Sequence, residues 1–284
     1  MIFLKHHKID RNVLTDRIVL ITGGGRGIGR GAAQGFSQYG ARVAIVSEPG
    51  TEEELEHTVK IIESDGGQAM SWVCDIRDQH QVEHTITEIE TRLGLIDVLV
   101  NNAAVMLKKP FENITSQQWH DAISVSLHGS YYCARAVYPG MLKRNDGAII
   151  NISSSAGYRG SYWGTSYCTG KFALEGLAQS LAQEAKTHNI LVTLATPGIS
   201  TKPTSVTEAM QRQMSEQETA QFVDPKVLTE GFCYLGIARH PILAGRRFNL
   251  FRLSEAIREN GFELDEDRVL DCQEGPFEVG RDIL

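Results

Sequence analysis

Tyr167 and Lys171 are four residues apart in the segment YCTGK. On a helix this spacing places the phenol and the ammonium on one face. A free tyrosine has a pKa of about 10 and is a poor base at neutral pH, and a neighbouring lysine cation favours the phenolate. The pair is therefore a candidate proton donor and acceptor. Taken alone, the same spacing also occurs by chance on ordinary helix surfaces.

A glycine-rich segment at residues 22–29 (TGGGRGIG) could hold phosphate groups. Glycines allow a tight turn and let backbone N–H groups approach a pyrophosphate at a helix N-terminus. Glycine is common in turns of every kind, so the cluster alone is weak. Its position between a predicted strand at 17–22 and a helix-like stretch at 30–39 is the context that predicts dinucleotide binding.

The elements that must position these residues are short apolar runs separated by amphipathic stretches. The runs lie at 17–22, 41–47, 69–74, 96–101, 147–153 and 190–196. Continuous hydrophobicity is typical of parallel strands that are covered on both faces. The stretches between them are long enough to cross over the sheet. The alternation predicts an α/β fold, a single-domain, doubly wound (Rossmann-type) parallel sheet with helices on both faces.

We expect one dinucleotide-binding and catalytic domain at residues 17–251. It would follow an N-terminal extension at 1–16 and precede an acidic C-terminal tail at 252–284. Residues 201–222 are polar and rich in Met and Gln, and they follow the sixth predicted strand. Loops that leave the carboxyl end of a parallel strand border the ligand crevice, so this segment is predicted to be a substrate lid. A surface helix with no role is the alternative.

Composition excludes several classes of protein. The chain has 284 residues, 42% of them apolar, and a net charge of −7, which argues against nucleic-acid binding. It has no uncharged apolar run of about 18 residues that could span a membrane, and its N-terminus lacks the apolar core of a secretory signal. The five cysteines are dispersed without a C-x-x-C pair. This spacing argues against a disulfide framework and against a metal site, and it favours a cytoplasmic location.

Several motifs occur together, in order, over roughly residues 15 to 205. They are T-G-x-x-x-G-x-G at 22–29, Asn101-Asn102-Ala103-Ala104, Ser154 thirteen residues before Tyr167, Tyr167-x-x-x-Lys171, and Pro197-Gly198. In this combination the chain resembles the short-chain dehydrogenase/reductase family. The resemblance implies an oxidoreductase that transfers a hydride between a nicotinamide cofactor and an alcohol or carbonyl substrate. It also implies a homodimer or homotetramer.

The resemblance assigns roles to individual residues. Tyr167 would exchange the proton, Lys171 would lower its pKa and hold the nicotinamide ribose, and Ser154 would orient the substrate oxygen. Asp75 would contact the adenine edge. The cofactor would be bound by residues spread over the chain: Gly23, Arg26, Gly27, Ile28, Gly29, Ser47, Glu48, Asp75, Ile76, Asn102, Ala103, Ala104, Tyr167, Lys171, Pro197, Gly198, Ile199 and Thr201.

The substrate pocket would be shaped by the loop between Ser154 and Tyr167. Three aromatic side chains and one arginine in it are candidate substrate contacts: Tyr158, Arg159, Tyr162 and Trp163. Aromatic rings suit a flat or hydrophobic substrate, and an arginine suits an anionic group. Aromatic packing and a solvent-facing arginine are the alternative reading of the same residues.

The chain departs from the family pattern at three places. Ser126 stands where the family has a catalytic asparagine that supports a water next to the lysine, and a serine hydroxyl is shorter but could still hold a water. Ala104 replaces a glycine. Residues 245–250 (GRRFNL) replace the usual sequence of the final strand. We expect activity to survive the change at Ser126, with a catalytically weak nucleotide-binding regulatory protein as the alternative.

The choice between NAD and NADP depends on the end of the second predicted strand. Ser47 stands where NAD-dependent relatives often carry aspartate, and Glu48 follows it. A carboxylate there repels a 2′-phosphate, so NAD is favoured. Arg26 in the glycine loop argues for NADP, which is the alternative. An epimerase or dehydratase on the same fold is a further alternative, and net consumption of cofactor would distinguish it.

Overall fold

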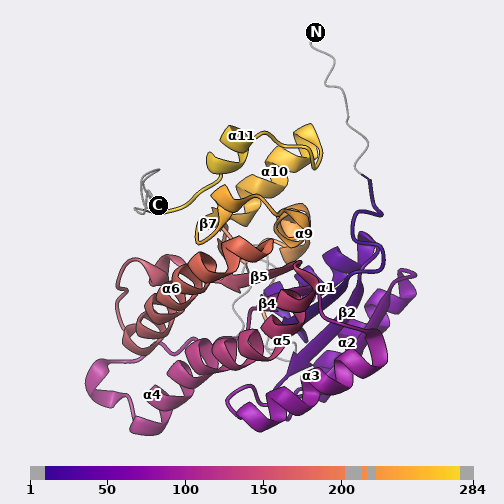
Figure 1. Cartoon of the computed structure of the whole chain (residues 1–284). Coiled ribbons are helices and arrows are strands. Elements are labelled where there is room, and N and C mark those ends of the chain that lie inside the picture. Colours follow the sequence, from indigo (N-terminus) through magenta and orange to yellow (C-terminus); the bar gives the residue numbers. More distant parts are fainter. Residues whose placement is uncertain (1–9, 202–212, 216–221, 276–284) are drawn as a thin grey trace.

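The computed structural model describes residues 10–201, 213–215 and 222–275. Its centre is a seven-stranded sheet in the order β3-β2-β1-β4-β5-β6-β7, and every pairing is parallel (Figure 1). The strands are β1 (Ile18–Thr22), β2 (Arg42–Ser47), β3 (Gln68–Val73), β4 (Val98–Asn101), β5 (Gly147–Ile152), β6 (Ile190–Thr196) and β7 (Arg247–Asn249). The predicted doubly wound parallel sheet is confirmed.

Helices cover both faces of the sheet (Figure 1). One face packs against α1 (Gly27–Gln38), α2 (Glu52–Ser64), α9 (Thr229–Ile237) and α10 (Leu250–Asn260). The other packs against α3 (Gln79–Leu93), α5 (Ser130–Arg144) and α6 (Thr165–Ala185). Side chains of one strand alternate between the two cores, Val19 in the first and Leu20 in the second, and both are buried. Burial on both faces explains why the strands are apolar without interruption.

The last part of the sheet includes residues whose sequence departs from the family pattern. Residues 247–249 form β7, which pairs with the end of β6. Residue 251, the predicted boundary of the domain, falls inside α10, and Leu253 and Ile257 of that helix are fully buried in the core. A short helix, α11 (Glu266–Leu270), follows, and Phe248 pairs antiparallel with Gln273. Residues up to Gln273, which follow the predicted domain boundary at 251, therefore pack against the sheet and its helices.

Two predicted segments lie largely outside the described residues. Of the proposed lid at 201–222, the structure describes Thr201, residues 213–215 and Phe222. Thr201 forms a parallel bridge with Val223. Of the N-terminal extension at 1–16, residues 10–16 are described, and Leu14 is fully buried with its N–H donating to the carbonyl of Tyr39.

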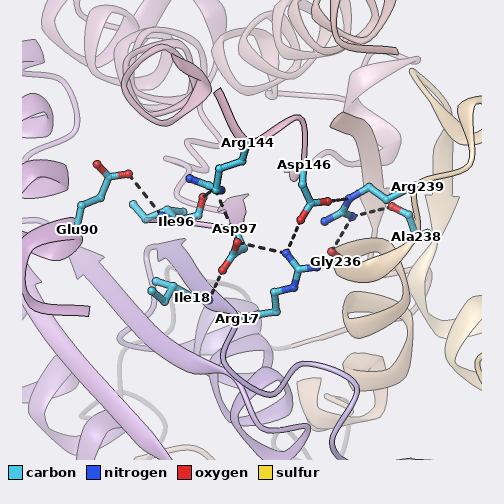
Figure 2. Close-up of polar contacts among 10 residues, drawn as sticks. All are labelled: Arg17, Ile18, Glu90, Ile96, Asp97, Arg144, Asp146, Gly236, Ala238 and Arg239. Carbon is cyan, nitrogen blue, oxygen red and sulfur yellow. Dashed lines mark hydrogen bonds and ion pairs between the residues drawn. The ribbon is translucent and has the colours of Figure 1, made fainter. Parts of the chain in front are cut away.

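A network of charged side chains lies where β1, β4 and β5 begin (Figure 2). Asp97 accepts a hydrogen bond from the backbone N–H of Ile18 at 2.8 Å and from Arg17 at 3.3 Å. Arg17 also contacts Asp146, which accepts a hydrogen bond from Arg239 at 2.6 Å. The network joins the starts of three strands to the chain that follows α9. It lies at the edge of the sheet opposite to the carboxyl ends of the strands.

In the described part of the chain no helix is long and apolar enough to cross a membrane. All five cysteines are buried free thiols. Among the residues that the structure describes, no group of three or more His, Cys, Asp or Glu side chains is arranged to hold a metal ion.

Candidate active site

Ser154, Tyr167 and Lys171 meet at the carboxyl end of β5. Ser154 is the second residue after the strand, and the other two lie in the first turns of α6. Ser154 and Tyr167 are joined by a hydrogen bond between their side chains. The Lys171 ammonium donates to the carbonyl of Ile152 at 2.5 Å and lies 5.8 Å from the centre of the Tyr167 ring. The three predicted catalytic groups therefore share one site.

The electrostatics of this site follow from burial. Lys171 is 2% exposed, and burial lowers its pKa to about 8 although the carboxylate of Glu175 raises it. Burial raises the pKa of Tyr167 above its usual value, while the hydrogen bond with Ser154 acts in the opposite direction. Of these two effects burial is the larger, so the net pKa of Tyr167 lies above its usual value. At neutral pH the phenol carries its proton.

Ser126 lies in a π-helical segment, Ser124–Gly129, between α4 (Ser116–Ile123) and α5. It is 1% exposed, and its hydroxyl has no hydrogen-bond partner among the described residues. A Cβ placed on Gly170 would lie 3.0 Å from the Cβ of Ser126, so the glycine allows this close approach. π-Helical turns are frequent at functional sites. The structure thus brings Ser126 against α6 between Tyr167 and Lys171, and its part in catalysis stays a prediction.

A cleft opens over the carboxyl ends of β1, β2, β3 and β4. It is lined by Gly23, Arg26, Val46, Ser47, Glu48, Cys74, Asp75, Ile76, Asn102, Ala103, Ala104, Val105 and Val125. Most of these were predicted as cofactor contacts. Val46, Cys74, Val105 and Val125 were not, and the first two directly precede Ser47 and Asp75 at the ends of their strands. The sequence contained a signal for Val46 and Cys74, because a residue that directly precedes a predicted contact at the end of a strand can line the same crevice.

The glycine loop fits a pyrophosphate. Gly23 and Gly27 have φ angles of +65° and +54°, a region that favours glycine. A Cβ on Gly29 would lie 2.2 Å from the carbonyl oxygen of Gly23. The first turn of α1, which includes Ile28, contains no acidic residue, and the side chain of Arg26 does not cap it. Its N–H groups and the helix dipole therefore favour an anion.

Two asparagines at the end of β4, Asn101 and Asn102, have different tasks. Asn102 donates from its side chain to the carbonyl of Thr22 at 2.8 Å, and its backbone N–H donates to the Thr22 hydroxyl at 3.0 Å. This links the glycine loop to the floor of the cleft. Asn101 donates to the side chain of Asn151 at 3.0 Å, which braces neighbouring strands.

The segment after β6 was also predicted to border the cofactor. Gly198 has a φ angle of +72°, and a Cβ there would lie 1.9 Å from the side-chain oxygen of Asn249. Only glycine fits this approach of the segment to β7. Pro197, Ile199 and Thr201 flank it at the same carboxyl edge of the sheet. Their contact with a cofactor stays a prediction.

Charged partners not predicted from the sequence lie beside the cleft. Nη1 of Arg26 lies 2.9 and 3.1 Å from the two carboxylate oxygens of Glu54, in the first turn of α2. Arg77 pairs with Asp75 at 2.6 Å and holds the pKa of that carboxyl below its usual value, mainly through their side-chain hydrogen bond. Glu54 and Arg77 both lie in polar stretches whose sequence is typical of an exposed surface.

The predicted substrate residues do not form one wall. The Tyr158 hydroxyl donates to Glu274 at 3.2 Å, and the Arg247 guanidinium lies 4.7 Å from the centre of its ring. Tyr162 and Trp163 stack on one another with their ring centres 4.7 Å apart, and Tyr162 is 81% exposed. Arg159 is exposed. The contact of these four side chains with a substrate stays a prediction.

The fold and the site together define a Rossmann-type oxidoreductase. A family model described as short chain dehydrogenase matches residues 17–215. The chain is 33% identical over 202 residues to the 3-oxoacyl-(acyl-carrier-protein) reductase FabG of Staphylococcus aureus, covering 71% of this chain and 81% of the relative. It is 34% identical over 185 residues to the 5-keto-D-gluconate 5-reductase of Escherichia coli, covering 65% and 72%.

Solved structures agree with these relatives. A metagenomic short-chain oxidoreductase in complex with NADP is 31% identical, with a TM-score of 0.64, over 75% of this chain and 96% of the other. A variant of actinorhodin polyketide ketoreductase with NADPH is 26% identical, with a TM-score of 0.73, over 82% and 96%. The chain belongs to the short-chain dehydrogenase/reductase family. It is an oxidoreductase that uses a nicotinamide cofactor and acts on alcohol or carbonyl groups.

Proposed function

We propose that this enzyme reduces the carbonyl group of a small-molecule substrate, with Tyr167 as the proton donor. The observation that carries the proposal is the hydrogen-bonded pair of Ser154 and Tyr167 above the buried Lys171. Because burial raises the pKa of Tyr167, the phenol holds its proton at neutral pH. A protonated phenol is the form that reduction needs. The two curated relatives described above are also reductases.

The residues divide the chemistry as follows. A bound nicotinamide supplies the hydride. The Tyr167 phenol gives its proton to the substrate oxygen, and the Ser154 hydroxyl donates a hydrogen bond to the same oxygen. The ammonium of Lys171 stabilises the phenolate that Tyr167 becomes. In the oxidative direction the same groups act in reverse, with Tyr167 accepting the proton.

We propose NAD as the favoured cofactor, against the NADP and NADPH of the two neighbouring structures described above. The Glu48 carboxylate lines the cleft and would repel a 2′-phosphate. Arg26 could attract that phosphate, but Glu54 holds its guanidinium. Among the described residues that line the cleft, Arg26 is the only basic side chain, and Glu54 already pairs with it.

The proposed form of the enzyme is a cytoplasmic homodimer or homotetramer. Tyr131 on α5 and Phe172 on α6 are 42% and 46% exposed, and such apolar side chains are suited to contact with a second copy. Buried free thiols fit a reducing compartment. Light scattering of the purified chain tests the assembly, and a monomer at micromolar concentration would contradict it.

The test of the function is turnover with defined carbonyl compounds. The purified chain is mixed with NADH or NADPH and with acetoacetyl-N-acetylcysteamine or 5-keto-D-gluconate, probes chosen from the chemistry of the relatives. We expect net oxidation of the reduced cofactor, and loss of it in Tyr167→Phe. Conversion of a probe without net consumption of cofactor would indicate an epimerase or dehydratase instead. Oxidation that persists unchanged in Tyr167→Phe would overturn the mechanism.

A further inference from the structure

The carboxylate of Glu274 lies where two loops of the site meet. One of its oxygens accepts a hydrogen bond from the Tyr158 hydroxyl at 3.2 Å, and the other accepts one from the Thr196 hydroxyl. Tyr158 belongs to the loop at 153–164 that starts with the serines after β5. Thr196 ends β6, directly before Pro197. One carboxylate therefore joins the Ser154 loop to the strand end that begins the predicted nicotinamide segment.

Arg247 extends these contacts to the catalytic helix. It donates to both carboxylate oxygens of Glu175 at 2.7 and 2.6 Å, and both side chains are about one-twentieth exposed (4% and 5%). Glu175 lies one helical turn after Lys171 and accepts a hydrogen bond from Ser153. A buried ion pair must offset the cost of removing two charges from water, so it persists only with such complete hydrogen bonding. The pair leaves Arg247 little freedom to move.

The main chain holds Glu274 on this rigid base. Its N–H donates to the carbonyl of Arg247 at 3.0 Å, and its own carbonyl accepts from the Arg247 guanidinium at 2.9 Å. Asn249 donates to the carbonyl of Cys272 at 2.8 Å. Gly275 has a φ angle of +97°, and a Cβ there would lie 2.3 Å from Arg247. Residues 272–275, the clasp segment, are thus anchored on β7 independently of the loop.

Tyr158 is the part of the loop that the clasp segment holds. Its ring lies against the Arg247 guanidinium, 4.7 Å from the ring centre to the central carbon, and its hydroxyl is bound to Glu274. Both ends of the side chain are therefore occupied by groups of the protein itself. A tyrosine held in this way is better suited to fix a loop than to adapt to a substrate.

We propose that Glu274 is a positioning residue, which acts through Tyr158 to hold the loop at 153–164 in the arrangement that the reaction requires. The proposal rests on the proposed roles of Ser154 and Tyr167, at the two ends of that loop. It assigns Tyr158 to the support of the site instead of to the substrate. It also gives the clasp segment a role in substrate turnover, and residues 272–275 do not line the cleft over the carboxyl ends of β1 to β4.

Hydrogen exchange measured by mass spectrometry on the full chain tests the proposal without a substrate. Tyr158→Phe removes the hydroxyl alone, and Glu274→Gln keeps the size of the side chain but removes its charge. We expect faster amide exchange at 153–164 in both variants, with the amides of β1 and β2 unchanged. Because the two groups act through one contact, the double variant should exchange no faster than the quicker single variant. Unchanged exchange in Tyr158→Phe, or an additive effect, overturns the proposal.

Kinetics separate positioning from a purely structural role. With acetoacetyl-N-acetylcysteamine, each single variant should lose about tenfold in kcat/KM, as expected for a hydrogen bond to a charged group, while the Kd for NADH stays unchanged. Gln273→Ala is the matched control, because that neighbour contacts Arg246 and not the loop. A rise in the Kd for NADH equal to the loss in kcat/KM would indicate general damage and contradict the proposal. If the probe is not reduced by the unaltered chain, the proposed function fails while the exchange result still stands.

Discussion

The guanidinium of Arg26 is paired with the carboxylate of Glu54, with Nη1 at 2.9 and 3.1 Å from the two oxygens. The pair joins the residue before α1 to the first turn of α2, and the two side chains are only 24% and 16% exposed. It lies at the edge of the cleft, which Arg26 and Glu48 both line. The positive charge of the glycine loop is therefore already neutralised by the protein.

Removal of the Glu54 charge should change the cofactor preference. In Glu54→Gln, Arg26 becomes available to a 2′-phosphate, and we expect the Kd for NADPH to fall about tenfold, which is about 1.4 kcal/mol. The Kd for NADH should stay within about twofold, because that cofactor lacks the phosphate. Fluorescence titration measures both constants. Glu56→Gln is the control, since Glu56 is exposed and pairs with Lys60 away from the cleft. An equal gain for both cofactors would refute this account of the pair.

Loss of the Tyr167 hydroxyl should separate chemistry from binding. General acid catalysis contributes about 10²- to 10⁴-fold, so Tyr167→Phe should lose turnover by that factor while the Kd for NADH is retained. Tyr138→Phe is a matched control, because this side chain lies on α5 and does not line the cofactor cleft. The comparison uses initial rates and cofactor titrations on the same preparations. Full activity of Tyr167→Phe would remove the phenol from the mechanism.

The buried Lys171 predicts the alkaline limit of reduction. Its pKa is lowered to about 8, so the ammonium is charged below that pH and loses its proton above it. Without the cation, the phenolate formed at Tyr167 is less stable, and kcat should fall as the pH rises through about 8. A pH profile of kcat measures this limb.

Glu175 should move that alkaline limb. Its carboxylate raises the pKa of Lys171, so Glu175→Gln should shift the fall in kcat to lower pH. Because the variant also breaks the buried pair with Arg247, its melting temperature must be compared first. A limb that stays in place, or moves to higher pH, in a variant that is folded would show that Lys171 does not set it.

The charge network at the start of the strands should control acid stability. Partial burial raises the pKa of the Asp146 carboxyl. Arg239 and Arg17 together lower it by a larger amount, so its net pKa lies below the usual value. Such a group stabilises the fold above the ordinary carboxyl pKa of about 4, and this stability is lost as the pH falls through the lower, folded-state value.

Asp146→Asn tests the network directly. The free energy of unfolding at pH 7 should decrease by about 1 to 3 kcal/mol, and the difference from the unaltered chain should shrink below about pH 4. Urea unfolding at several pH values measures it. Asp65→Asn, at an exposed helix end, should change stability little. A difference that is constant down to pH 2 would mean that the charge of Asp146 contributes nothing.

The sheet was predicted well because its strands are buried on both faces. The strand predicted at 17–22 is observed as β1 at Ile18–Thr22, and the strand predicted at 190–196 is observed as β6 with the same bounds, Ile190–Thr196. β7 was not predicted as a strand. It has three residues, and its first is an arginine, whose charge looks unsuited to a buried strand until Glu175 is placed beside it. A partner that lies 72 residues away in the chain leaves no local pattern.

The sequence by itself determined what depends on local spacing. The helical period placed Tyr167 and Lys171 on one face, and glycines 23–25 lie in the turn between β1 and α1. Only the tertiary structure decided which distant charges meet. Arg26 and Glu54 are 28 residues apart, and Tyr158 and Glu274 are 116 apart. The reason is physical: periodicity records which face of an element is buried, whereas the neighbours on that face depend on the order of the strands in the sheet.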